Sequence, residues 1–203
     1  MSTTNPKKTG RRPGTTQTRE AIAQAARTLF AEHGYERATI RKIAAAAGVD
    51  PALVVHFFGS KEDLFSDVMA LPEALGDLMA QIAAGERSTV GRRLAQLIVG
   101  MLENPATRAI VLGRIRSAAT HPDAAALVRE TVSRDILRLA TALGTDNAEM
   151  RASLVGSHLV GVAFARYLVG VEPLASLDAA TMVDLLADDF QRCLVEPLPA
   201  VPR

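Results

Sequence analysis

Residues 40–58 read IRKIAAAAGVDPALVVHFF, two apolar segments at helical spacing that are separated by Gly48. Thr39 is placed to cap the first predicted helix, and Gly48 ends that helix because glycine adopts the left-handed conformation without strain. Asp50 and Pro51 then supply the N-cap and the first residue of the second helix. Two short helices joined through a glycine turn are the elements of a helix-turn-helix.

The two predicted helices, 40–47 and 51–57, each have an inward and an outward face. Ala44 is small at the position where the two helices must cross. The side chains expected on the inward faces are Ile43, Ala47, Val49, Val54 and Phe57. The side chains expected on the outward face of the second helix are Asp50, Pro51, Ala52, Val55 and His56. Such a face can enter the major groove of DNA, although a helical hairpin inside an ordinary core would show the same pattern.

Basic residues on both sides of this motif favour DNA as its partner. Residues 1–65 carry ten Lys and Arg against six Asp and Glu, whereas the rest of the chain carries thirteen against sixteen. Residues 1–16 are rich in Pro, Gly and Thr, so we expect a flexible basic arm, with a merely solvated tail as the alternative. The cations expected to contact DNA phosphates are Lys7, Lys8, Arg11 and Arg12 in the arm and Arg41, Lys42 and Lys61 around the two helices.

Residues 18–65 resemble the DNA-binding domain of the TetR family of bacterial regulators. The resemblance lies in the segments TREAIAQAARTLFAEHGYERATIRKIAAAAGV and FFGSKEDLF, where spacing and residue types agree. It implies DNA contacts from the helix after Gly48, from the start of the helix before it at Thr39, Arg41 and Lys42, and from Lys61. It also implies that the chain represses transcription.

The chain departs from the family pattern within the helix that would read the DNA. Val55 stands where the family usually has a tyrosine, and Phe57 stands where a histidine is frequent. His56 is then the main polar side chain on the outward face, while Ala52 and Val55 suit only the methyl groups of thymine. We therefore expect backbone contacts, the arm and DNA shape to carry more of the selectivity than usual.

The remaining sequence predicts an all-α fold of about nine helices, with an arm at 1–16, a three-helix helix-turn-helix domain at 17–65 and a helical ligand-binding and dimerisation domain at 66–203. Apolar residues recur at helical spacing, and no run alternates convincingly with period two. Gly and Pro mark the breaks between helices. Beyond the helix-turn-helix, helices are expected at about 17–34, 61–84 with a bend at Pro72, 88–103, 105–119, 122–143, 147–170 and 177–195.

The apolar C-terminal helices predict a pocket for a small apolar ligand, such as a lipid-like metabolite, whose binding releases the DNA. The candidate lining residues are Met101, Leu112, Ile115, Val128 and Val132, together with His158 and Arg166. For His158 and Arg166 other roles stay open: facing solvent, capping a dimer seam, or pairing with an acid such as Glu172.

The last two helices are expected to form a homodimer, which would bind a near-palindromic operator in double-stranded DNA. Small residues on the penultimate helix permit close approach, and the last helix has an apolar face. The residues chosen for this interface are Gly156, Gly161, Leu185, Leu186 and Phe190.

Other classes of protein find little support in the sequence. The motifs GxSxG, HExxH and GxxxxGK[ST] are absent, so we expect neither an enzyme nor a cofactor. The four histidines lie far apart and Cys193 is the single cysteine, which predicts no metal site and a reducing, cytoplasmic setting. Residues 154–171 are apolar but interrupted by His158 and Arg166, so we expect no membrane span. A helical adaptor without DNA binding is the remaining alternative.

Overall fold

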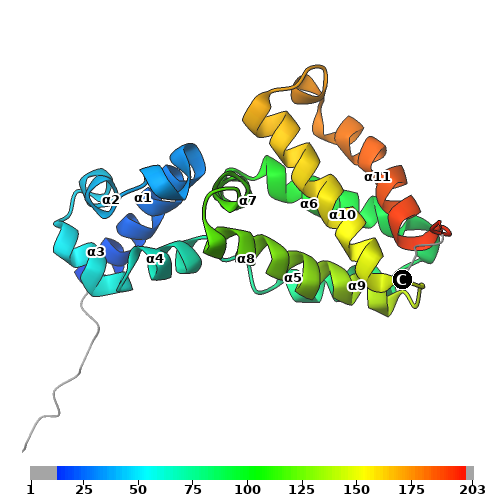
Figure 1. The fold of residues 1–203 in the computed structure, drawn as a ribbon, viewed down its shortest axis with the longest axis horizontal. Coiled ribbons are helices and arrows are strands. Elements are labelled where there is room, and N and C mark those ends of the chain that lie inside the picture. The colour runs from blue at the N-terminus through cyan, green and yellow to red at the C-terminus, as the bar shows by residue number, and fades with distance from the viewer. Residues whose placement is uncertain (1–12, 200–203) are drawn as a thin grey trace, which may run out of the picture.

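The computed structural model describes residues 13–199, and every regular element in that range is a helix. The all-α prediction is confirmed. Figure 1 shows α1 to α4 gathered at one end of the molecule and the later helices packed in a larger bundle at the other end. The predicted arm residues Lys7, Lys8, Arg11 and Arg12 lie outside the described residues.

Four helices form the N-terminal group, and their ends follow the local signals in the sequence. Thr39 Oγ1 accepts a hydrogen bond from Lys42 N, and Asp50 Oδ1 accepts one from Ala52 N at 2.8 Å. The first helix begins earlier than expected, inside the predicted arm, and it is broken at Gly34, where φ is 73°. The four helices are α1 (Pro13–Arg37), α2 (Ile40–Ala47), α3 (Pro51–Phe58) and α4 (Lys61–Val68).

The C-terminal bundle contains the remaining helices, two of which pass through π-helical segments. The predicted helix over 61–84 is in fact two helices, because the chain between Met69 and Ala74, which includes Pro72, is not helical. The elements are α5 (Leu75–Ala84), η1 (Arg87–Thr89), α6 (Val90–Glu103), α7 (Pro105–Ala118), α8 (Pro122–Glu130), η2 (Thr131–Ile136), α9 (Leu137–Ala142), α10 (Ala148–Ala163), η3 (Phe164–Val169), η4 (Leu174–Ser176) and α11 (Ala179–Val195).

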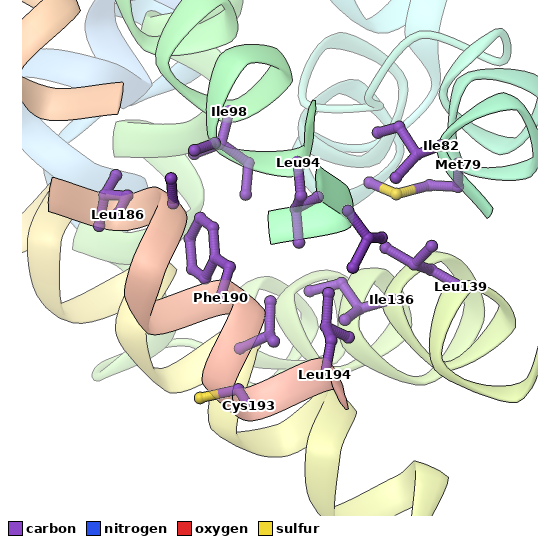
Figure 2. Close-up of a cluster of buried hydrophobic side chains, with 14 of the residues drawn as sticks. Met79, Ile82, Leu94, Ile98, Ile136, Leu139, Leu186, Phe190, Cys193 and Leu194 are labelled. Atoms are coloured by element: carbon purple, nitrogen blue, oxygen red, sulfur yellow. The ribbon is translucent and has the colours of Figure 1, made fainter. Parts of the chain in front are cut away.

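The core of this bundle forms where α11 lies against α6. Gly91 permits the close approach, because a Cβ atom at that position would lie 2.3 Å from the Ala187 carbonyl oxygen. Figure 2 shows Leu186 and Phe190 from α11 pointing into the same cluster as Leu94 from α6. Leu186 and Phe190 are therefore core residues of one subunit, buried to 4% and 0% exposure, and their assignment to a dimer surface was wrong.

A buried arginine ties the start of α10 to the end of α11. Arg151 is only 1% exposed, and its guanidinium donates to the Asp146 backbone carbonyl at 2.7 Å and to the Cys193 carbonyl at 2.8 Å. It also forms an ion pair with the Asp146 carboxylate. This one side chain joins the start of one helix to the end of the next.

The helical stretch Ala148–Val169, formed by α10 and η3, is long and apolar enough to cross a membrane by length and composition alone. The most apolar 18 residues of this stretch have a mean hydropathy of 1.4, and 22% of them are buried inside the protein. The stretch packs against η2 and α11, and it carries the buried Arg151. A helix that contributes to a core passes the same test, so this finding is weak evidence for a membrane span.

Candidate nucleic-acid interface and ligand cavity

Gly48 makes the turn between α2 and α3. Its backbone is left-handed (φ 67°, ψ 32°), its N–H donates to Ala45 O at 3.2 Å, and the next N–H, from Val49, donates to Ala44 O at 3.0 Å. Ile43 of α2 and Val54 of α3 are then buried together in the N-terminal core. The turn leaves the opposite side of α3 facing away from the domain.

The outward face of α3 is exposed, as the sequence pattern predicted. Val55 is 51% exposed, and Leu53, which the sequence reasoning did not select, is 39% exposed. The Asp50 carboxylate caps the helix by accepting a hydrogen bond from the Ala52 backbone N–H. The remaining predicted residues on this face, Pro51, Ala52 and His56, are also exposed.

The predicted phosphate-binding cations near this face differ in how strongly the rest of the protein holds their side chains. Arg41 is exposed at the start of α2, while Lys42 Nζ donates to the carbonyl of Arg37 at 3.1 Å. Lys61 Nζ lies 4.0 Å from the centre of the Tyr35 ring, and burial lowers the pKa of its ammonium. The sequence predicted Lys61 as a cation that contacts DNA phosphates, but its ammonium group packs on the Tyr35 ring of its own subunit.

Two family models match the chain, one in each group of helices. The model described as "Bacterial regulatory proteins, tetR family" matches residues 22–68. The model described as "Tetracyclin repressor-like, C-terminal domain" matches residues 88–194, more than half of the chain. The chain belongs to the TetR family.

One solved structure supports this assignment over most of the chain, and a second shares the fold. The chain is similar to a crystal structure of a TetR-family regulator from Streptomyces coelicolor A3, with 34% identity and a TM-score of 0.58, over 91% of this chain and 98% of that one. NalD of Pseudomonas aeruginosa, the secondary repressor of the MexAB-OprM multidrug efflux pump, shares the fold with a TM-score of 0.64 over 91% of this chain and 99% of NalD, at 19% identity.

Curated relatives match over a shorter length. The transcriptional repressor AcnR of Corynebacterium glutamicum is 38% identical over 90 residues, which are 44% of this chain and 43% of AcnR. The regulator BetI of Rhizobium meliloti is 35% identical over 82 residues, which are 39% of each protein. The chain therefore matches less than half the length of these curated relatives.

The C-terminal bundle of this TetR-family chain contains a cavity of about 70 Å³. Of the residues predicted to line a ligand pocket, the structure places Met101, Ile115, Val128 and Val132 on its wall. Leu112 does not line it and packs against the main core instead. The other lining residues are Leu71, Leu75, Met79, Ile98, Leu102, Val111, Arg114, Thr131, Ile136, Gly156, Leu159 and Val160.

Two residues predicted to contact a ligand lie elsewhere. The exposed His158 has its Nδ1 atom 3.6 Å from Cys193 Sγ, on the side of α10 that meets α11. Arg166 donates to the backbone carbonyls of Leu174 and Leu177, so it braces the connection between η3 and α11. Both assignments to the pocket were wrong, because α10 and η3 turn these polar side chains away from the cavity.

Sequence reasoning missed Arg114, which is 7% exposed on the cavity wall. Its Nε donates to the carbonyl of Met69, the residue that ends α4, at 2.6 Å, and its Nη1 donates to Thr131 Oγ1 at 2.8 Å. Burial lowers the pKa of this guanidinium to about 10. A signal was available, because Arg114 falls three residues after Val111 on the apolar side of the predicted helix.

The helix that carries Arg114 also holds the DNA-binding domain in place. Ser117 Oγ accepts a hydrogen bond from Tyr35 N at 2.9 Å, and Arg116 Nη1 donates to the Glu32 carbonyl at 2.8 Å. The rings of Tyr35 and His121 lie 3.5 Å apart, centre to centre. The helix α7 therefore contributes to the cavity wall and also contacts α1 and the end of α4.

An exposed apolar face on α10, η3 and α11 is the candidate dimer surface. Gly161 lies on it, and in the described part of the chain no atom beyond its own stretch of helix would come within 4 Å of a Cβ at this position. Gly156 does not belong to it, because a Cβ at that position would lie 2.6 Å from Val132 Cγ2 inside the subunit. The large apolar side chains exposed in this part of the chain are Met150, Phe164, Val169, Val171 and Leu185.

Proposed function

We propose that this chain is a homodimeric, DNA-binding transcriptional repressor that is released from its operator by a small molecule bound in the cavity. The observation that carries the proposal is the exposed face of α3, presented by a capped helix-turn-helix that α7 connects to the cavity wall. The relatives named AcnR and NalD are repressors, which supports the proposal. A DNA-binding role also favours a cytoplasmic location over a membrane one.

DNA binding is tested by recovering the genomic fragments that the full-length protein retains and mapping the protected bases. We expect a near-palindromic site, because two α3 helices related by a two-fold axis read two similar half-sites. Fragments without a shared sequence, or retention that does not weaken as salt is raised, would favour a helical adaptor.

His56→Ala is expected to relax base preference at one step in each half-site. His56 is the main polar side chain on the exposed face of α3, and a lost base contact is worth about 1–3 kcal/mol of discrimination. Binding to a library with randomised half-sites measures the effect. His33→Ala is the matched control, since His33 is exposed on α1, outside the α3 face. An unchanged base preference in His56→Ala would remove this residue from the readout.

The proposed release follows from the position of α7 between the cavity and the DNA-binding domain. A ligand that prefers an arrangement with a shifted α7 would move Tyr35 and Met69, the two contact points on α1 and after α4. A hundredfold preference of the ligand for that arrangement corresponds to about 3 kcal/mol, so the bound ligand lowers operator affinity by at most about the same factor.

Filling the cavity is expected to abolish the response to ligand while leaving operator binding intact. In Ile115→Phe the larger ring occupies space that a ligand needs, so compounds that raise Tm and release DNA from the wild type should do neither. A thermal-shift screen coupled to fluorescence anisotropy of labelled operator measures both effects. Leu78→Phe, on an exposed position of α5 outside the cavity, should respond like the wild type.

The small volume of the cavity favours a second candidate function, a constitutive repressor without a ligand. Pockets for small molecules usually enclose about 300–1,000 Å³. The cavity of about 70 Å³ is well below that range. If no compound in the screen both raises Tm and releases operator DNA, the constitutive function is the better description.

A further inference from the structure

Two aliphatic side chains are exposed on α3. Of the large apolar side chains in the described residues of α1 to α4, only Leu53 and Val55 are exposed, at 39% and 51%. The others in these four helices and their turns are buried or packed against the core of the same domain. The exposed apolar surface of this domain is therefore concentrated on one helix of eight residues, the helix that faces the DNA.

Leu53 and Val55 lie on opposite flanks of the outward face of α3. Successive residues of a helix are about 100° apart around its axis, so Ala52 and His56 share the centre of this face. By the same geometry Leu53 and Val55 point about 160° apart, one to each side of that centre. Val54, between them in sequence, is 1% exposed and faces the core. A helix placed in the major groove would therefore bring Leu53 and Val55 to different base pairs.

The rest of this face has few groups that can form hydrogen bonds with base edges. The Asp50 carboxylate accepts a hydrogen bond from Ala52 N at 2.8 Å, and the side chains of Pro51 and Ala52 have no donor or acceptor. His56 supplies the polar side chain at the centre. The apolar group that base pairs display in the major groove is the 5-methyl group of thymine. Aliphatic side chains on the flanks of α3 match that group.

We propose that α3 recognises 5-methyl groups in the major groove, with Leu53 and Val55 each contacting the methyl group of a different base pair. The inference rests on the proposed function as a DNA-binding repressor and names the chemical feature that this repressor selects. The sequence pattern assigned only Ala52 and Val55 to thymine methyl groups. The exposure of Leu53 makes it a further specificity-determining residue and supplies the second large contact.

Replacing each thymine of the operator by uracil, one at a time, tests the methyl contacts directly. The operator is the site recovered from genomic fragments, and uracil keeps the hydrogen-bonding groups of thymine while lacking its methyl group. Loss of one buried methyl group is expected to weaken binding about 4-fold in one half-site, and about 15-fold when both half-sites are changed. We expect such losses at two base steps in each half-site, measured by anisotropy of labelled duplexes.

Replacement by cytosine and then by 5-methylcytosine separates the methyl group from the base that carries it. At each step that is sensitive to uracil, the thymine·adenine pair is changed to a cytosine·guanine pair, with and without the 5-methyl group. Because the two cytosine duplexes differ only in that methyl group, the methylated one is expected to bind about 4-fold more tightly.

Leu53→Ala and Val55→Ala assign each side chain to its base step. Both side chains are exposed, so alanine removes no core contact, and alanine is favourable in a helix. Each variant should lose the uracil effect at one step and keep it at the other. Leu78→Ala is the matched control, because Leu78 is 38% exposed on α5, outside the DNA-binding helices, and it should keep both effects.

Operator binding that changes by less than ~2-fold with every uracil replacement overturns the inference and leaves the proposed function intact. A full uracil effect at both steps in the two alanine variants also overturns it, because other residues then make the methyl contacts. A loss of affinity in Leu53→Ala that is equal on thymine and uracil operators removes Leu53 from the readout. If the full-length protein retains no DNA sequence in preference to others, the proposed function fails, and this inference fails with it.

Discussion

Gly161→Arg is expected to convert the protein to a monomer and to weaken operator binding by about 100-fold or more, because two linked half-site contacts become single ones. Gly161 lies on the exposed apolar face, and within residues 13–199 no atom outside its own stretch of helix lies within 4 Å of a Cβ at this position. The arginine therefore leaves the subunit undisturbed and places a charge where a second copy of α10 is expected to pack. Leu185 and Phe164 are at least half exposed in one subunit, and in the monomeric variant they would no longer be covered by the second subunit.

Sedimentation velocity measures the association state, and anisotropy of labelled operator measures the affinity. Gly100→Arg is the matched control, because Gly100 is also an exposed helical glycine with open space around it, on α6. That variant should remain a dimer with wild-type operator affinity. A dimer of unchanged stability in Gly161→Arg would show that this face is not the one the two subunits share.

Arg151→Met is expected to lower the free energy of unfolding by about 3 kcal/mol, through the loss of charged hydrogen bonds in the interior. Methionine fills much of the same space, but it leaves the carbonyls of Asp146 and Cys193 without their donors. These bonds join the start of α10 to the end of α11. The same variant should therefore loosen the helices that carry the proposed dimer surface.

Urea denaturation followed by circular dichroism measures this loss, with Arg129→Met as the control for removing an exposed arginine.

Acid provides a further check, because Arg151 lowers the pKa of the Asp146 carboxylate. Because the pKa of Asp146 is lower in the folded state, the ion pair stabilises the fold at pH values above the ordinary pKa of an aspartate. This stabilisation is lost as the pH falls through the lowered pKa. The difference in stability between wild type and Arg151→Met should therefore shrink in acid. A constant difference would assign the effect to the hydrogen bonds with the backbone carbonyls and to packing, and not to the ion pair with Asp146.

The helix-turn-helix could be derived from the sequence because its signals act over a few residues. Thr39, Gly48 and Asp50 each set the local backbone through their own side chain or conformational freedom, and each makes the cap or turn that the sequence indicated. The separate α4 and α5 show the limit of this approach. The apolar pattern continues across Pro72, but the chain there is not helical.

Only the tertiary structure decided which apolar residues face the core, the cavity or the outside. Leu185 and Leu186 are neighbours of the same type, yet one is 54% exposed and the other is buried against α6. Arg114 and Arg116 lie on one helix, and one reaches the cavity while the other holds α1. Periodicity identifies an apolar stripe but not the partner that covers it. That partner is set by how helices distant in the sequence pack together, and a single sequence does not encode those contacts in any local pattern.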